Sequence, residues 1–223
     1  MAGLNNIICP LCHSLSIVNY CSDKRRDYYQ CEQCRLVFVP PCQHLSWEEE
    51  KAHYDLHQNS PEDQGYRQFL SRLANPLKAV LIPGARGLDF GSGPGPALSV
   101  MLEEAGFDMA IYDIFYANNM SVLQSEYDFV ATTEVVEHLS APGKVLESLY
   151  SMIRPGGYLG AMTKMVLDQT AFSSWHYKND QTHISFYSRE TFNYLAQTWG
   201  ASVEYPDSDV VLIKKPQQIN PDE

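Results

Sequence analysis

The sequence lacks any long apolar run and is poor in basic residues. None of its apolar stretches approaches the roughly 18 residues that a membrane-spanning helix needs, so we expect no membrane partner. Lys and Arg together number 16 against 27 Asp and Glu, and the formal net charge is −11. Because binding to nucleic acid depends largely on Lys and Arg contacts with phosphates, this balance argues against a nucleic-acid partner. The first 20 residues contain neither a basic start nor a long apolar segment, so we expect no secretory signal and a cytoplasmic location.

A glycine-rich segment follows the first clear strand of the larger part of the chain. Arg86–Phe90 predicts a short buried strand, residues 91–95 read Gly-Ser-Gly-Pro-Gly, and Ala97–Glu104 has helical spacing. Glycine has no Cβ and adopts positive φ readily, so such a loop lets a ligand approach the backbone closely. Free N–H groups at the start of the next helix favour an anionic or polar ligand group. The segment therefore predicts a nucleotide-type cofactor site at the carboxyl end of a parallel strand.

The spacing of the glycines indicates which cofactor is bound. The dinucleotide pattern G-x-G-x-x-G would place its third glycine at Pro96, but here the third glycine is Gly95. The observed pattern is D-x-G-x-G-x-G, formed by Asp89, Gly91, Gly93 and Gly95. It resembles motif I of the class I S-adenosylmethionine-dependent methyltransferases. The alternative interpretation is a helix-capping glycine turn that binds no ligand.

Further segments resemble the same family in the same order, over roughly residues 60–215. Asp108–Tyr112 predicts a second strand, and Tyr127–Thr132 predicts a central strand followed by an "EHL" ending at 137–139. Residues 153–157 read Ile-Arg-Pro-Gly-Gly, which is similar to the family's "LRPGG" before its next strand. The resemblance implies an enzyme with a Rossmann-like three-layer α/β sandwich. It also implies a mainly parallel, seven-stranded sheet with an antiparallel last strand.

One departure from the family concerns the third strand of the sheet. Only residues 114–126 separate Asp113 from the central strand, and a helical crossover alone takes at least about 10–12 residues. We therefore expect the second crossover helix to be lost and the third strand to be short, at Met120–Leu123.

The resemblance also implies how S-adenosylmethionine is held. The glycine loop is expected to hold the methionine portion, with Asp89 bracing the loop and Asp113 binding the ribose hydroxyls. Ile114 is expected beside the adenine, and Thr133 and Glu134 beside the sulfonium. The complete expected set is Asp89, Gly91, Ser92, Gly93, Gly95, Asp113, Ile114, Thr133 and Glu134.

The acceptor is expected to lie against residues 172–188. Asp180-Gln-Thr-His183-Ile-Ser-Phe-Tyr-Ser resembles the "D-x-T-H-x-x-F-[YFW]-S" segment of many small-molecule members. His183 is the candidate catalytic residue, as a general base oriented by Asp180, because histidine titrates near neutral pH. The alternative is a histidine that only holds the loop in place. We therefore predict direct methyl displacement onto a small-molecule acceptor. An RNA methyltransferase and a non-catalytic cofactor-sensing or adaptor protein stay open, and the sequence predicts neither the acceptor atom nor the oligomeric state.

Two C-x2-C pairs lie near the start of the chain. Cys9, Cys12, Cys31 and Cys34 match the spacing of a zinc site. Four thiolates close a tetrahedral site and leave no position for a catalytic water, so we expect a structural Zn²⁺. Disulfides and inert thiols are the alternatives, and disulfides would need an oxidising compartment. Cys21 and Cys42 are expected to be ordinary thiols.

These features divide the chain into four expected parts. Residues 1–45 form a zinc ribbon, 46–82 a helical linker that covers the cofactor, 83–215 the methyltransferase core, and 216–223 a disordered polar tail. The basic cluster Lys24-Arg25-Arg26 is interpreted as a solvated loop of the ribbon.

Overall fold

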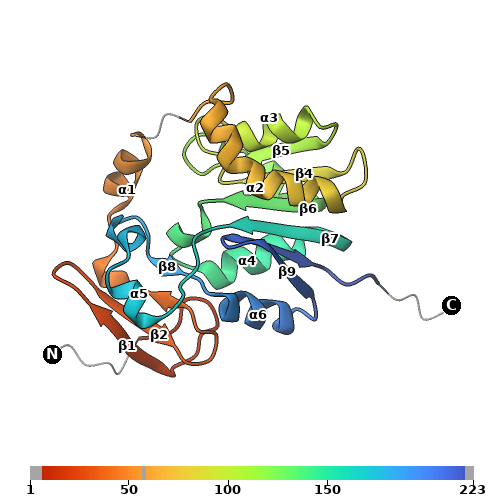
Figure 1. Ribbon diagram of the computed structural model, residues 1–223. Coiled ribbons are helices and arrows are strands. Elements are labelled where there is room, and N and C mark those ends of the chain that lie inside the picture. Colours follow the sequence, from red (N-terminus) through yellow and green to blue (C-terminus); the bar gives the residue numbers. More distant parts are fainter. Residues whose placement is uncertain (1–6, 57–58, 219–223) are drawn as a thin grey trace.

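A six-stranded sheet runs through the larger part of the protein in the computed structural model, which describes residues 7–56 and 59–218 (Figure 1). The strand order is β5 (Asp108–Tyr112), β4 (Arg86–Phe90), β6 (Tyr127–Thr133), β7 (Ile153–Met162), β10 (Val210–Lys214) and β9 (Ser202–Asp207). The first four strands pair in parallel, while β10 is antiparallel to both β7 and β9. The prediction of a mainly parallel sheet with an antiparallel last strand is confirmed.

Helices cover both faces of this sheet, which confirms the three-layer sandwich (Figure 1). On one face, α2 (Gln64–Val80) and α3 (Ala97–Glu103) share a core with Phe129 and Leu212. On the other face, α4 (Pro142–Ser151) and α6 (Arg189–Thr198) share a core with Val130 of β6 and Val211 of β10, which are the sequence neighbours of Phe129 and Leu212. Successive strand residues point to opposite faces, so apolar pairs in β6 and β10 serve both layers.

The prediction of seven strands is wrong, because the described residues form six in this sheet. The segment Met120–Leu123, expected to be the third strand, lies in the 3₁₀ helix η3 (Met120–Gln124). Asn119 caps η3 by accepting a hydrogen bond from the N–H of Ser121 at 3.1 Å. Residues 113–117 are already used by a turn closed by two backbone hydrogen bonds between Asp113 and Ala117. Too little chain remains for both a crossover and a strand.

A second, small antiparallel sheet lies beside the first (Figure 1). Its order is β1 (Ile17–Ser22), β2 (Asp27–Cys31), β3 (Val37–Phe38) and β8 (Ser185–Phe186). The last of these comes from far along the chain, within the segment 172–188 that is expected to hold the acceptor. The 3₁₀ helix η2 (Pro41–Gln43) follows β3.

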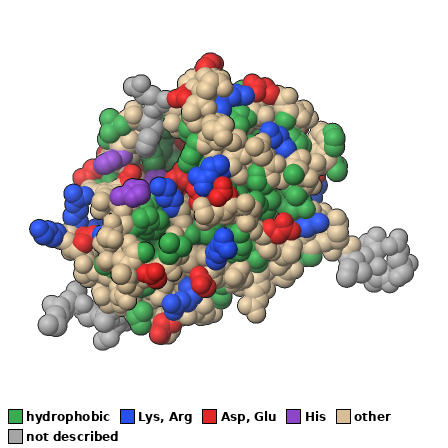
Figure 2. All heavy atoms as spheres, in the orientation of Figure 1, with side chains coloured by type: hydrophobic (Ala, Val, Ile, Leu, Met, Phe, Trp, Pro, Cys, Tyr) green, Lys and Arg blue, Asp and Glu red, His purple; other side chains and the backbone are tan. Residues whose placement is uncertain are grey.

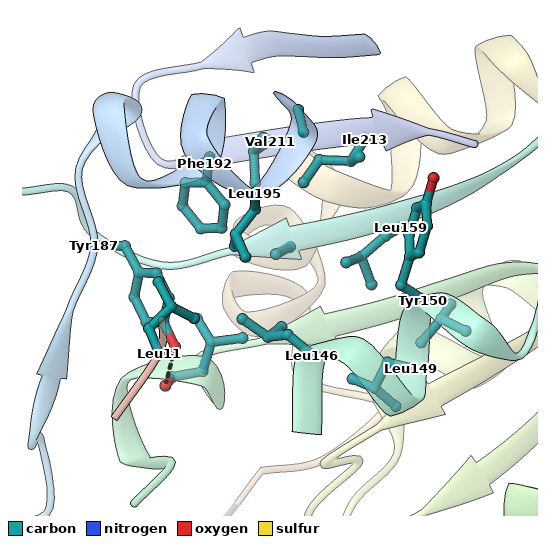
Figure 3. Close-up of a cluster of buried hydrophobic side chains, with 14 of the residues drawn as sticks. Leu11, Leu146, Leu149, Tyr150, Leu159, Tyr187, Phe192, Leu195, Val211 and Ile213 are labelled. Atoms are coloured by element: carbon teal, nitrogen blue, oxygen red, sulfur yellow. Dashed lines mark hydrogen bonds between the residues drawn. The ribbon is translucent and has the colours of Figure 1, made fainter. Parts of the chain in front are cut away.

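The two sheets share one hydrophobic core. Leu11, which lies between the first two cysteines, packs with Leu146 of α4 and with Tyr187 (Figure 3). The N–H of Gly143, at the start of α4, donates to the carbonyl of Pro10 at 3.2 Å. The amino-terminal sheet is therefore part of the packing of the larger region.

Four short elements surround the carboxyl edge of the parallel strands. They are α1 (Trp47–Tyr54), η4 (Val136–His138), α5 (Gln169–Ser173) and η5 (His176–Asn179). No helix among the described residues is long and apolar enough to cross a membrane. Of the expected disordered tail, residues 216–218 have no regular structure, with the carbonyl of Pro216 accepting from the N–H of Gly156, and 219–223 lie outside the described residues.

Candidate functional site

The glycine loop between β4 and α3 needs glycine for two different reasons. Gly91 has φ +81°, and a Cβ there would lie 2.3 Å from a methyl carbon of Val135. A Cβ on Gly95 would lie 2.0 Å from the carbonyl oxygen of Asn59. Gly93, with φ +64°, faces open space, because nothing lies within 4 Å of its Cβ position. The first and third glycines permit close packing, while the middle one leaves bare backbone open to a ligand.

Asp113, at the end of β5, ties this loop to the next one. Its Oδ2 accepts a hydrogen bond from the N–H of Gly93 at 3.0 Å. Its Oδ1 accepts from the N–H groups of Phe115 at 2.8 Å and Tyr116 at 3.0 Å. A carboxylate offers about four lone-pair positions, so three N–H donors leave one position for a ligand hydroxyl.

Buried polar atoms without a hydrogen-bond partner among the described residues gather around the same loop. They include Oδ1 of Asp89, Oγ of Ser92 and Oε1 of Glu134. Burial raises the pKa of Asp89 to about 7, and burial together with the charges of Asp89 and Glu134 raises the pKa of Tyr66 to about 12. Unpaired buried acceptors are costly, and a cationic, hydrogen-bonding ligand would satisfy them.

The turn after β6 carries backbone strain. Glu134 has φ +52°, in the left-handed region that side chains other than glycine rarely adopt. The N–H of this residue donates to the carbonyl of Met162 at 2.8 Å, and Thr133 is paired with Met162 in the sheet. Such strain persists where the surrounding structure holds it, commonly at functional sites.

Glu134 and Glu137 share the hydroxyl of Tyr177. The Tyr177 oxygen lies 3.2 Å from Oε2 of Glu134, and it is also hydrogen-bonded to Oε1 of Glu137. Burial raises the pKa of both carboxyl groups; repulsion from Glu137 adds to the rise for Glu134, and repulsion from Asp180 adds to it for Glu137. Burial also raises the pKa of Tyr177. The single hydroxyl proton of Tyr177 can point at only one of these two carboxyl groups at a time.

His183 is held by the backbone rather than by Asp180. Its Nδ1 lies 2.7 Å from the carbonyl oxygen of Tyr177, so Nδ1 carries the proton. The nearest Asp180 oxygen is 3.9 Å from Nε2, while the other accepts two hydrogen bonds from Thr182. Burial and the neighbouring His138 lower the pKa of His183 to about 4. The ring is therefore neutral near pH 7, and it is a weaker base than an exposed histidine.

Arg26 clamps the segment around His183. This side chain is only 6% exposed, although its cluster was interpreted as a solvated loop, and that interpretation is wrong for Arg26. Its guanidinium donates to the carbonyl oxygens of Lys178, Asp180, Gln181 and His183. Lys178 adds an ion pair with Asp23, in the same β1–β2 turn as Arg26. The turn of the small sheet therefore fixes the backbone of residues 178–183.

Aromatic rings from α1 lie between the two halves of the site. The ring of Phe115 is 4.4 Å from Trp47 and 5.5 Å from Tyr54, centroid to centroid. Tyr54 also packs edge-on against His138 at 5.2 Å. Figure 2 shows histidine side chains gathered on this side of the molecule, beside basic and acidic groups. The rings of α1 thus connect Phe115, in the turn after Asp113, with His138.

The four predicted zinc ligands come together in the small sheet. One sulfur from each of Cys9, Cys12, Cys31 and Cys34 lies within 4.8 Å of all the others, and two pairs are 3.5 Å apart. Tetrahedral zinc with bonds of about 2.3 Å needs sulfur atoms about 3.8 Å apart, so the cluster fits that ion. The residues after each pair, His13 and Arg35, both have positive φ near +60°. Each of them donates its N–H to the first cysteine of its pair, so the two knuckles repeat one another.

Comparison with known proteins identifies the fold and the family. Residues 57–205 match a family model described as "Methyltransferase domain". The chain belongs to this methyltransferase domain family.

Solved and curated methyltransferases resemble parts of the chain at low identity. The fold is similar to magnesium protoporphyrin IX methyltransferase from Synechocystis, with TM-score 0.53, 14% identity, and coverage of 75% of this chain and 94% of that one. It is also similar to an O-methyltransferase family protein from Burkholderia thailandensis, with TM-score 0.50, 11% identity and coverage of 76% and 64%.

In sequence, 82 residues are 28% identical to ubiquinone biosynthesis O-methyltransferase from Pseudomonas savastanoi pv. phaseolicola, over 36% of this chain and 35% of that one. The same enzyme name and figures apply to Pseudomonas syringae pv. syringae. The chain thus spans about a third of the length of these curated relatives.

Within the methyltransferase domain, the predicted residues fall into two groups. Asp89, the glycine loop and Asp113 lie together at the carboxyl ends of β4 and β5, with Thr133 and Glu134 at the end of the neighbouring strand β6. Ile114 is 47% exposed on the turn after Asp113. His183 lies apart from these residues, in van der Waals reach of the His138 and Tyr177 rings.

The sequence alone did not point to Glu137, in the methyltransferase domain, or to the role of Arg26, which lies before that domain. Glu137 is completely buried, although it lies next to a turn. Its only signal was an acidic residue followed by a histidine, Glu137-His138, within five residues of the end of strand β6. Arg26 offered no local signal, because all four of its acceptors lie more than 150 positions away.

Proposed function

We propose that this protein transfers the methyl group of S-adenosylmethionine to a small-molecule acceptor. The observation that carries the proposal is the open backbone at Gly93, bordered by the unpaired atoms of Asp89, Ser92 and Glu134. S-adenosylmethionine bears an ammonium group and a sulfonium centre, and buried carboxylate groups that each keep one oxygen without a hydrogen-bond partner among the described residues suit such a cation. The membership of the methyltransferase domain family agrees with this chemistry.

Each part of the site would have a distinct task. Residues 91–95 and Asp89 would hold the methionine portion, and the remaining lone pair of Asp113 would accept from a ribose hydroxyl. Ile114 offers an apolar surface to the adenine, and Thr133 and Glu134 would lie beside the sulfonium. The cofactor supplies an electrophilic methyl group, so the protein must mainly align the acceptor and exclude water.

The surroundings of His183 favour a small acceptor over RNA. Tyr177, His183 and Phe172 are buried, so an acceptor must insert among side chains rather than lie on an open face. Arg26, a basic residue of the ribbon, points inward and is engaged by four carbonyls. The matched relatives are named for ubiquinone biosynthesis and for magnesium protoporphyrin IX, both of which concern small molecules.

We further propose that residues 1–45 form a ribbon around one structural Zn²⁺. The ligands would be Cys9, Cys12, Cys31 and Cys34, with Cys21 and Cys42 outside the site. The linker (46–82) and core (83–215) complete the proposed division. Thiolate ligands require a reducing compartment, which supports a cytoplasmic location.

A thermal-shift titration of the wild-type protein tests the proposed function. S-adenosylmethionine and S-adenosylhomocysteine should both raise the melting temperature, because each binds the folded state. NAD at the same concentration should not. Absence of any shift at millimolar S-adenosylmethionine, or a shift with NAD instead, would contradict the proposal. A panel of small hydroxyl, amine and carboxylate compounds, analysed by mass spectrometry for added methyl groups, then identifies the acceptor class.

A further inference from the structure

Beside the proposed cofactor site lies a cluster of one carboxylate and two imidazoles. A carboxylate oxygen of Glu137 and a ring nitrogen from each of His138 and His183 lie within 4.8 Å of one another. The two histidine rings are 4.7 Å apart and inclined by 67°. Glu137 and His138 come from η4, at the carboxyl end of β6, whereas His183 comes from the segment that Arg26 clamps.

Both rings are oriented by backbone carbonyls. Nδ1 of His138 lies 3.1 Å from the carbonyl oxygen of Thr182, and Nδ1 of His183 lies 2.7 Å from that of Tyr177. A carbonyl only accepts hydrogen bonds, so each Nδ1 carries the proton and each Nε2 keeps its lone pair. Metal-binding histidines are commonly fixed in this way, by a second hydrogen bond on the opposite ring nitrogen.

Glu137 supplies a second, independent observation. The residue is 0% exposed, and its Oε1 is hydrogen-bonded to the hydroxyl of Tyr177. Its Oε2 is buried without a hydrogen-bond partner among the residues that the structure describes. A buried carboxylate oxygen in that state is costly unless a cation or donor binds it.

The surrounding charge is mainly negative. Glu134 reaches the cluster through Tyr177, and an Asp180 oxygen lies 3.9 Å from Nε2 of His183. Of the basic side chains in this region, Lys164 has its Nζ over the Tyr177 ring at 5.4 Å, Arg26 is occupied by carbonyls, and Lys178 is paired with Asp23. The balance of charges favours a cation at the centre of the cluster.

From these contacts we infer that Glu137, His138 and His183 bind a divalent first-row transition-metal ion, which in turn binds an oxygen of the acceptor. One carboxylate and two imidazoles suit Mn²⁺, Fe²⁺, Co²⁺ or Zn²⁺, and three protein ligands leave positions open. Ligand atoms around such an ion lie about 3.0–3.4 Å apart, so the three side chains draw together on binding.

The ion gives His183 a role that differs from general base. A hydroxyl bound to a divalent cation has a lower pKa, so its proton is released to water near neutral pH. The resulting oxyanion is the nucleophile that methylation at oxygen requires. The acceptor class is therefore a compound with a hydroxyl group and, to use a second open position, a neighbouring oxygen atom. This acceptor class rests on the proposed methyltransferase function, whereas binding of the ion does not.

A Mn²⁺ titration monitored by electron paramagnetic resonance tests the inference. The protein used must retain the metal ion proposed for the four ribbon cysteines. The wild type should bind one Mn²⁺ per chain beyond the ribbon metal. Glu137→Gln and His183→Gln should each weaken binding by more than about 100-fold, since loss of a supporting group alone costs 10–100-fold. His176→Gln is the matched control, because His176 is exposed on the same segment, and it should bind Mn²⁺ like the wild type.

Two results would overturn the metal site. One is a wild type that binds no Mn²⁺ at millimolar concentration, and the other is unchanged affinity in both variants, each shown to be folded by its melting curve. The cofactor titration keeps the two proposals separate. A protein that S-adenosylmethionine stabilises but that binds no Mn²⁺ contradicts only the metal site. Mn²⁺ binding without any cofactor response supports the metal site and contradicts the methyltransferase proposal.

Discussion

The proposed cofactor side of the site, residues 86–116, and the proposed acceptor side, residues 172–188, are built in different ways. On the cofactor side, contacts are short in sequence: Ser99 donates to Asp89 ten positions away, and Gly93 to Asp113 twenty positions away. On the acceptor side, the backbone is held by Arg26, 152 to 157 positions away. A strand, a glycine loop and a helix that follow one another in sequence can form the proposed cofactor site through local contacts. The proposed acceptor pocket depends instead on the small sheet, a distant part of the chain.

The substitution with the largest expected effect disrupts the small sheet. Cys31→Ser should abolish zinc binding and unfold the small sheet, because structural zinc contributes on the order of 10–16 kcal/mol to such domains. Since Leu11 and Leu36 belong to the shared core, the melting temperature of the whole protein should also fall. Elemental analysis and thermal unfolding measure both effects.

Cys42→Ser is the control for this change, because Cys42 is exposed and lies outside the cluster. It should keep one zinc ion per chain and the wild-type melting temperature. Equal zinc content in the two variants would contradict the assigned ligands.

The second substitution removes the guanidinium of Arg26 and leaves the four proposed zinc ligands unchanged. Arg26→Met leaves two buried and two partly buried carbonyl oxygens without their charged donor, and we expect a loss of roughly 3–5 kcal/mol in the free energy of unfolding. Lys24→Met, two residues away and exposed, should change it by less than about 0.5 kcal/mol. Urea unfolding of both variants measures the difference. Similar unfolding curves would show that the clamp does not hold the acceptor side.

The third substitution tests whether the buried carboxyl group of Asp89, on the proposed cofactor side, lowers the free energy of unfolding. The pKa of Asp89 is raised to about 7 in the folded protein, above its unfolded value near 4. Folded protein therefore holds this proton more tightly, and its stability falls as pH rises from about 4 to 7. Asp89→Asn does not ionise, so above pH 7 it should be more stable than wild type by roughly 2–4 kcal/mol, a gain that vanishes near pH 4.

Unfolding curves of wild type and Asp89→Asn across pH 4–8 measure this difference. The same variant should bind S-adenosylmethionine more weakly, because it offers the cation no negative charge. A stability difference that does not change with pH would contradict the raised pKa.

The substitution with the smallest expected effect removes the charge of Asp113, the residue proposed to bind the ribose of the cofactor. Asp113→Asn should weaken S-adenosylmethionine binding by roughly 1.5–3 kcal/mol, the range for hydrogen bonds to a charged group. Asp108→Asn, an exposed residue of the same strand, is the control and should bind normally. Isothermal titration calorimetry measures both affinities, and equal affinities would exclude Asp113 from the ribose contact.

The same contrast explains how much the sequence predicted. The strands Arg86–Phe90 and Asp108–Tyr112 were predicted with the observed bounds, because periodicity and turn residues act locally. The third strand was wrong, since Met120–Leu123 was predicted to be a strand and capping by Asn119 favours a 3₁₀ turn there. The two-residue strand Ser185–Phe186 has no sequence signal of its own.

The acceptor side was less predictable for the same physical reason. His183 was found by resemblance, but Asp180 was expected to orient it, and a carbonyl does so instead. The burial of Glu137 depends on Tyr177, forty positions away, and spacing cannot reveal such a contact.

Hydrogen–deuterium exchange of wild type and Arg26→Met, with and without S-adenosylhomocysteine, tests the comparison most directly. The account predicts that Arg26→Met accelerates exchange over residues 176–187, while residues 86–116 exchange as in the wild type. It also predicts that S-adenosylhomocysteine slows exchange over 89–95 and 113–116 in both proteins. Faster exchange over both segments in the variant, or loss of the cofactor's effect, would contradict the claim that the two sides are built independently.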